Sequence, residues 1–202
     1  MVYSVVSHNT EEPHTCHLPS EVSKLEPSIV ERLSLIHMSP TKQSIENGTL
    51  NSRKIIRMRW ARRTDFTPTP KQVERGLTDH EWSIRVTWSI RSDFNSTPEQ
   101  IERGLSDKYP EVRMAWAGRK DWTSTSEQVE IGLTDEDAWV REAWVKRKDF
   151  TPTPEQLERG VSDVSADVVK AWMQRTDDAV WTEVQIERGL QHHDRDIRQS
   201  WE

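Results

Sequence analysis

The sequence predicts an all-α protein built as an α-solenoid, a one-dimensional stack of short two-helix repeats. Two observations carry this prediction. Five tryptophans follow one another at a spacing of 28 residues and a sixth comes 29 residues later, namely Trp60, Trp88, Trp116, Trp144, Trp172 and Trp201. Each of them is preceded, four residues earlier, by Val or Ile, and a Thr-x-x-Gln pattern recurs between them. Self-similarity at such a period is typical of repeat proteins.

The spacing also predicts how the chain is divided. Residues 1–25 show no trace of the repeat, and we expect them to form a flexible N-terminal leader. Residues 26–202 are predicted to form an array of about six 28-residue units, of which the first and the last are degenerate. The last unit stops just after its Trp, so a homodimer through the C-terminal repeat would cover its open face.

The first predicted helix of each complete unit has a strong start signal. A Thr at the N-cap is followed three residues later by Gln, which is the pattern of a capping box. This pattern occurs at Thr69, Thr97, Thr125, Thr153 and Thr182. Pro70, Pro98 and Pro154 fit the first helical position. A glycine recurs late in this helix, where it would cost about 1 kcal/mol, so it predicts a close approach of another segment or a helix end.

The second predicted helix carries the Trp. A Ser/Thr-Asp pair, such as Thr78 and Asp79, precedes it and is expected to start it. The Val or Ile and the Trp share one face because four residues make about one helical turn. A unit of 28 residues cannot bury enough surface alone, so this face must pack against neighbouring units.

The segment Val140 to Arg147, of the form Val-Arg-x-Ala-Trp-x-x-Arg, with the following Asp149 and capped helix, resembles leucine-rich-repeat-variant and HEAT-like helical repeats. The resemblance covers about residues 26–202. It implies a right-handed stack of short two-helix repeats that presents a curved surface to a partner. One branch of HEAT-like proteins is DNA glycosylases, but the acidic balance of this chain argues against that activity. The cysteine cluster of some variant-repeat proteins has no counterpart here.

Composition excludes further classes of function and of site. The formal net charge is −6 at pH 7, which argues against a general electrostatic footprint for nucleic acid. Cys16 is the single cysteine, so this chain alone holds no disulfide framework, four-cysteine zinc site or iron–sulfur cluster. This points to a reducing, cytoplasmic location. No stretch of 18 apolar residues occurs, and we expect no membrane span.

Two arginines flank each Trp, and they allow two interpretations. Aromatic and basic side chains that alternate along a groove stack bases and contact phosphates, which would make a nucleic-acid surface. Acidic residues recur just as regularly, so the arginines are better explained as ion-pair ladders within and between repeats. If a nucleic acid binds, the arginines three residues before Trp are the better candidates because they lie toward the border of the apolar face. They are Arg57, Arg85, Arg113, Arg141 and Arg198.

The four residues between the Asp and the Val or Ile of each repeat differ completely from one repeat to the next. Three large aromatic residues stand in or next to this variable segment, and large aromatics at variable positions are typical anchors of protein interfaces. They are Trp82, Tyr109 and Trp139, and their acidic neighbours are Glu81, Glu111, Glu136 and Asp137. The alternative is that the aromatic side chains only pack between repeats.

The sequence therefore predicts a non-enzymatic module that binds a protein partner through the edge or concave face of the solenoid. No cofactor and no catalytic constellation is indicated. His14, Cys16 and His17 do not complete a metal site, so we expect no metal. Nucleic-acid binding through the arginines is the first alternative. The second is an acidic inhibitor that imitates DNA and occupies the basic groove of a nucleic-acid-handling enzyme of a host or defence system.

Overall fold

The computed structural model describes residues 40–175, 182–192 and 195–201, and within these ranges the chain is all-helical, with twelve helices and no strand. The expected leader at residues 1–25 lies outside the described residues, as does His14 with its neighbours. The predicted all-α class is confirmed.

Two kinds of helix alternate along the chain. The Thr-capped helices are α2 (Lys42–Thr49), α4 (Pro70–Leu77), α6 (Pro98–Leu105), α8 (Ser126–Leu133), α10 (Pro154–Val161) and α12 (Glu183–Leu190). The Trp-bearing helices are α3 (Lys54–Ala61), α5 (Trp82–Ser89), α7 (Pro110–Ala117), α9 (Ala138–Val145), α11 (Ala166–Met173) and α13 (Arg195–Trp201). Each pair of consecutive helices forms one repeat.

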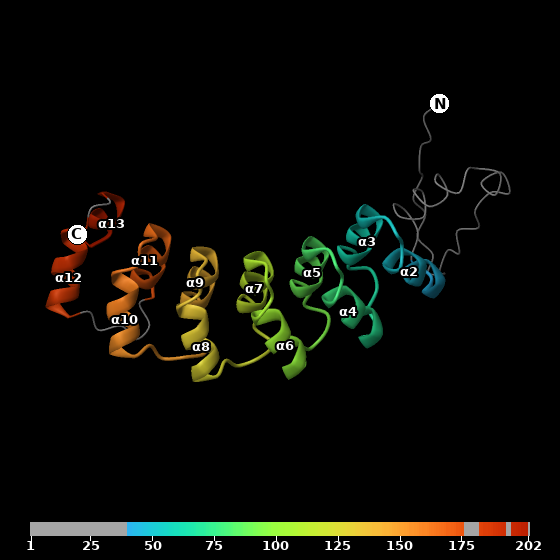
Figure 1. The fold of residues 1–202 in the computed structure, drawn as a ribbon, viewed down its shortest axis with the longest axis horizontal. Coiled ribbons are helices and arrows are strands. Elements are labelled where there is room, and N and C mark those ends of the chain that lie inside the picture. Colours follow the sequence, from blue (N-terminus) through green and yellow to red (C-terminus); the bar gives the residue numbers. More distant parts are fainter. Residues whose placement is uncertain (1–39, 176–181, 193–194, 202) are drawn as a thin grey trace, which may run out of the picture.

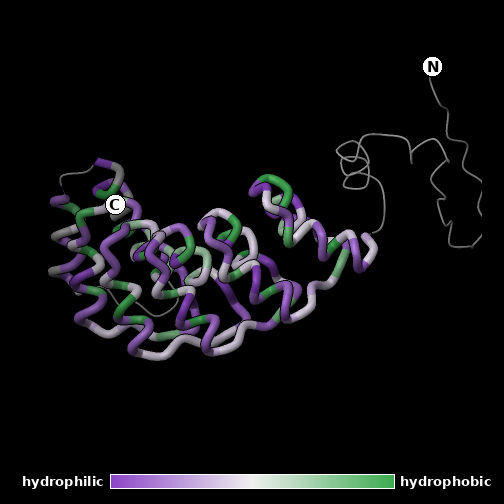
Figure 2. Tube along the Cα trace, turned by 45° about the vertical axis from the view of Figure 1, so that its right-hand side comes forward, coloured by the Kyte–Doolittle hydropathy of each residue, from purple (hydrophilic) through white to green (hydrophobic). Residues whose placement is uncertain are grey.

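The helices lie in two rows that together form a curved array (Figure 1). The Trp-bearing helices form the inner row, on the concave side, and each packs against the Trp-bearing helix of the next repeat. The Thr-capped helices form the outer row and contact one another less closely. Apolar residues recur in every repeat rather than in one central block (Figure 2). The hydrophobic core therefore runs along the array, between the rows.

The repeated tryptophans fill the space between the two rows. Five of them are at most 3% exposed, namely Trp60, Trp88, Trp116, Trp144 and Trp172. The glycine of the outer helix makes this packing possible, because a Cβ added to Gly132 would lie only 2.1 Å from Nε1 of Trp144. The predicted close approach is thus confirmed: each indole ring lies against the backbone of its own outer helix.

The start of the outer helices follows the prediction. The capping box is present at all five predicted threonines. At Thr125, for example, the hydroxyl accepts the backbone N–H of Gln128 at 3.2 Å, and the Gln128 side chain accepts the N–H of Thr125 at 3.0 Å. Two of the otherwise unsatisfied N–H groups of the first turn are satisfied in this way.

The inner helices begin later than the sequence suggested. α5 begins at Trp82, three residues after Asp79, and the Asp79 carboxylate accepts the N–H of Glu81 at 2.9 Å. Thr78 instead ends the preceding outer helix, where its hydroxyl donates to the carbonyl oxygen of Glu74 at 2.8 Å. The Asp therefore holds the turn in front of the Trp-bearing helix rather than capping its first residue.

The arginine three residues after each Trp joins consecutive repeats. Nη1 of Arg119 donates to the carbonyl oxygens of Ser89 and Arg91, at 2.5 and 2.7 Å, at the C-terminal end of α5. The same guanidinium binds Asp121 of its own repeat at 2.8 Å and lies 4.3 Å from the ring centroid of Phe94. Arg91 and Arg147 repeat this arrangement, so the ladder expected within repeats is confirmed.

Candidate interaction surfaces

The arginines three residues before Trp lie inside the array, between repeats. Both Nε and Nη2 of Arg113 bind the Asp135 carboxylate of the next repeat at 2.8 Å, and Nη1 donates to the carbonyl oxygen of Asp107 at 2.9 Å. The hydrogen bonds that Arg113 donates to Asp135 raise the pKa of Arg113. The same pair forms at Arg57, Arg85 and Arg141, and we call this series the inner ladder.

The inner ladder is more buried than the sequence suggested. We expected these arginines toward the border of the apolar face, yet the side chains of Arg113 and Asp135 are each only 10% exposed. The reason is that each guanidinium lies between two repeats rather than on the rim of one. The ladder expected between repeats is confirmed, and it occupies the donors that a phosphate would need.

The inner ladder ends before the last repeat. Val169, which is buried, stands where the other repeats have the arginine, and His192 stands where they have the aspartate. Both partners of the pair have therefore changed together. Arg198, which the sequence placed in the same column, is half-buried and donates to the carbonyl oxygen of His192 at 2.6 Å.

Two of the candidate aromatic residues pack against each other. Trp82 begins α5 and Tyr109 directly precedes α7, and their rings are stacked with centroids 5.9 Å apart and planes at 27°. The Lys108 ammonium lies 4.9 Å from the centroid of the Tyr109 ring and the Arg85 guanidinium 5.5 Å from it. Both aromatic side chains are half-buried. This pair therefore joins two repeats and still shows part of its surface to solvent.

Trp139 is different, because 59% of it is exposed. It lies in the first turn of α9, where the Asp137 side chain caps the helix by accepting the N–H groups of Trp139 and Val140 at 2.9 and 3.3 Å. Glu136 is exposed, and its carboxylate comes only within 3.5 Å of Arg113. Asp137 thus has a structural role, because it caps the helix turn that carries the exposed indole.

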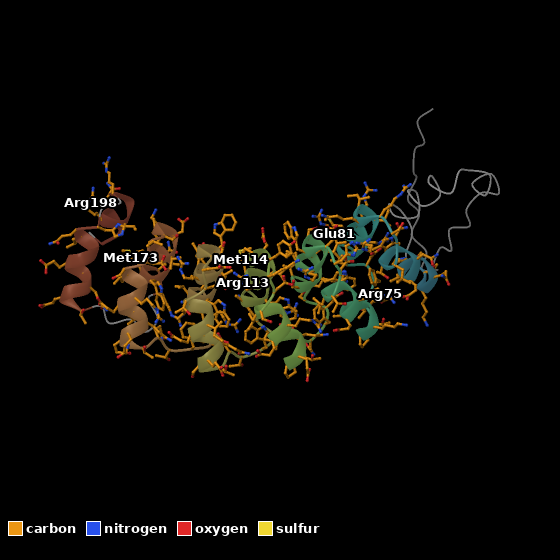
Figure 3. All side chains as sticks on the ribbon, in the orientation of Figure 1. Arg75, Glu81, Arg113, Met114, Met173 and Arg198 are labelled. Carbon is orange, nitrogen blue, oxygen red and sulfur yellow. The ribbon has the colours of Figure 1, made fainter. Side chains whose placement is uncertain are left out.

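The remaining acidic candidates have local partners or none. Glu81 binds Lys54 of the preceding repeat at 2.7 Å, and this hydrogen bond lowers the pKa of Glu81. Glu111 is half-buried, and its enclosed Oε2 has no hydrogen-bond partner among the described residues. Glu81 and Arg113 both lie on the inner row (Figure 3). Among the seven candidates, Trp82 contacts Tyr109, and Asp137 caps the helix turn that carries Trp139.

The outer row carries a third series of pairs, which we call the outer ladder. A Glu of one outer helix accepts hydrogen bonds from the capping-box Gln and from an Arg of the next outer helix. Complete pairs join Glu46 to Arg75, Glu74 to Arg103 and Glu130 to Arg159, each at 2.8 Å. Arg75 is labelled on the outer row in Figure 3. The sequence analysis missed this series, although its signal was the spacing of 29 residues between Glu and Arg.

The outer ladder lacks one arginine. Ile131 of α8 stands where the neighbouring repeats have Arg103 and Arg159, and it is 59% exposed. Glu102 therefore binds only the Gln128 side chain, at 2.5 Å. A small cavity of about 70 Å³ opens at this point between α6 and α8, and Glu102, Ile131 and Trp144 are among its lining residues.

Two further findings concern a metal site and a membrane span, neither of which the sequence indicates. Among the residues that the structure describes, no three His, Cys, Asp or Glu side chains lie together as a metal site would require. No helix in those same ranges is both long enough and apolar enough to cross a membrane.

Comparison with known proteins gives no neighbour. No family model, no curated protein and no solved structure matches this chain. The argument for function therefore depends on the array and on the surfaces just described.

Proposed function

We propose that this protein is a non-enzymatic interaction module that binds a protein partner through the edge of its concave side where Trp139 lies. In this proposal the curved array is an α-solenoid, a right-handed stack of HEAT-like repeats. The observation that carries the proposal is the 59% exposure of Trp139, whereas the five buried repeat tryptophans are at most 3% exposed. Tryptophan is the residue type most enriched among the energetic centres of protein interfaces, because it buries a large rigid surface at little entropic cost.

The rigidity of the array supports this use. The inner ladder, the outer ladder and the arginine contacts at the C-terminal ends of the inner helices all cross from one repeat to the next. Asp137 additionally holds the first turn of α9 under the exposed indole. A surface that is already ordered loses little conformational entropy on binding, so more of the contact energy appears as affinity.

The inner ladder also bears on the choice between partner classes. The guanidinium groups of Arg57, Arg85, Arg113 and Arg141 each bind a carboxylate and are almost fully buried. A phosphate backbone would have to displace these aspartates to bind there, at the cost of separating buried charges. This favours a protein partner over a nucleic acid at the arginine column.

The experiment is affinity capture from a lysate of the source cells, with and without nuclease treatment, with the immobilised full chain as bait and identification by mass spectrometry. Three baits are compared: wild type, Trp139→Ala and the control Val164→Ala. Val164 is 92% exposed in the loop before the next inner helix, so its replacement tests the loss of an exposed apolar side chain near the same edge. We expect one protein to be retained equally by wild type and the control and to fall at least about tenfold with Trp139→Ala.

Two results would oppose the proposal. Identical capture by all three baits would remove Trp139 from the interface. Capture that is abolished by nuclease, and that weakens steeply with salt, would instead support nucleic-acid binding. A captured nucleic-acid-handling enzyme that competes with DNA for the bait would support the inhibitor alternative.

A further inference from the structure

The gap in the outer ladder is unlike the gap in the inner ladder. At the junction with the last repeat the inner ladder has lost both members at once, since Val169 stands in place of the arginine and His192 in place of the aspartate. In the outer ladder only the arginine is gone, because Ile131 replaces it while Glu102 is retained. Glu102 keeps its hydrogen bond from Gln128 of the next repeat but lacks the cation that the neighbouring glutamates bind.

The neighbouring pairs show what Glu102 lacks. In the repeats on either side, Arg103 binds Glu74 and Arg159 binds Glu130, each with nitrogen and oxygen 2.8 Å apart. Each glutamate also accepts a hydrogen bond from the capping-box Gln, and Glu102 keeps this bond. Glu102 is therefore held in the orientation that its neighbours use to bind a guanidinium.

The space for a guanidinium is present as well. An isoleucine side chain ends where the long arginine stem would continue, and the cavity of about 70 Å³ lies beside it. Its walls combine the Glu102 carboxylate with apolar groups of Leu105, Ile131 and Trp144. An acidic group beside an apolar wall suits an arginine side chain, which has a planar charged end on an aliphatic stem.

We infer that this cavity binds an arginine side chain of a basic segment of a partner polypeptide, which completes the outer ladder from outside. The charge of the outer row fits a basic segment, since the first turns of α6, α8 and α10 each carry an exposed acid, namely Glu99, Glu127 and Glu155. The exposed Ile131 offers an apolar contact to a residue next to the arginine. The site lies on the outer row and is independent of the proposed role of Trp139.

The test is titration of the ¹⁵N-labelled full chain with the peptide acetyl-Gly-Arg-Gly-amide, followed by NMR. We expect saturable shifts at the amides of Glu102 and Ile131 and at the indole N–H of Trp144, with a Kd on the order of millimolar for a single ion pair. The same peptide with citrulline in place of arginine keeps the shape and loses the charge. It should bind at least about tenfold more weakly.

Two variants and one control make the test specific. Ile131→Arg supplies the missing arginine within the chain, so it should abolish binding while the protein stays folded. Glu102→Gln should weaken binding at least about tenfold, whereas Glu74→Gln changes a pair that already has Arg103 and should leave the affinity unchanged. The inference is wrong if the wild-type protein shows no saturable shift up to about 20 mM peptide, well above a millimolar Kd. It is equally wrong if Ile131→Arg or the citrulline peptide binds as wild type does with arginine.

Discussion

The two ends of the inner helices differ in how their sequence is used. At the C-terminal end, each arginine three residues after Trp makes the same contacts with the preceding repeat, as Arg91, Arg119 and Arg147 show. At the N-terminal end, the side chains vary in type and in exposure: Trp82 is stacked on Tyr109, while Trp139 extends into solvent. The C-terminal end is thus constant, whereas the N-terminal end varies around the inner ladder, which also joins the repeats.

A physical asymmetry of the helix explains this division. The last carbonyl groups of a helix have no partner within it and carry partial negative charge. Here they are satisfied by a cation from the next repeat, so that residue has to be an arginine at a fixed position. The turn in front of each inner helix is held locally, since Asp107 and Asp135 accept the N–H two residues further on, just before the first helical residue. The residues after the Asp therefore meet few structural demands.

The largest expected effect comes from removing a buried repeat tryptophan. Trp116→Ala leaves a cavity between the rows at a ring that is 2% exposed, so we expect a loss of about 3–5 kcal/mol in the free energy of unfolding. Trp139→Ala at the variable end should change it by less than about 0.5 kcal/mol. Urea unfolding followed by circular dichroism measures both. Equal losses would contradict the division between a constant and a variable end.

The next effect comes from the arginine of the constant end. Arg119→Ala removes the cation that binds the carbonyl oxygens of Ser89 and Arg91, and it leaves Asp121 without its main partner. Because the Arg119 side chain is only 6% exposed and its removal leaves two enclosed carbonyl oxygens without their donor, we expect a loss of about 3 kcal/mol in urea unfolding. Lys120→Ala, at the exposed neighbouring position, is the control and should have almost no effect. Similar losses of unfolding free energy for Arg119→Ala and Lys120→Ala would show that the contacts of Arg119 do not hold the repeats together.

The carboxylates at the constant end also predict how stability depends on pH. Burial raises the pKa of Asp121, but hydrogen bonds from Arg119 and from the N–H of Ser96 outweigh it and lower the pKa to about 2. The pKa of Asp149 is lowered to about 2 in the same way, by Arg147 and the N–H of Ser124. A lowered pKa in the folded state stabilises the fold above the ordinary value of 3.8, and this contribution is lost as the pH falls to about 2.

The test compares wild type with Asp121→Asn/Asp149→Asn in urea unfolding between pH 6 and pH 2. At pH 6 the variant should be less stable, by on the order of 1 kcal/mol for each carboxylate once solvent screening of these partly exposed groups is allowed for. This difference should shrink below pH 4 and become small at about pH 2, where about half of the wild-type carboxylates are protonated. A difference that stays constant over the whole range would mean that these two groups do not titrate with folding.

Much of the repeated framework was predictable from the sequence, because its signals are local or strictly periodic. The capping box at Thr125 needs only residues three apart, and the regular columns of Arg and Asp were enough to predict ladders. The carbonyl partners of Arg119 were not predictable, since they depend on how one repeat is rotated against the next. The same holds for Ile131: its deviation from Arg is visible in the sequence, but the cavity beside Glu102 is visible only once α6 and α8 are packed.

The smallest effect concerns the variable end itself, where Trp82 and Tyr109 form an aromatic stack between two variable segments. If these residues also help to join the repeats, Trp82→Ala and Tyr109→Ala should each destabilise the protein, and the double variant should lose less than the sum. We expect a coupling energy of about 1 kcal/mol, which is typical of stacked aromatic pairs. A second cycle with Tyr109 and Trp139, between which no ring contact is found, should give a coupling near zero. If only the first cycle shows coupling, the variable end is itself divided into two parts. Its aromatic residues pack against each other at α5 and α7, whereas Trp139 at α9 is free for recognition.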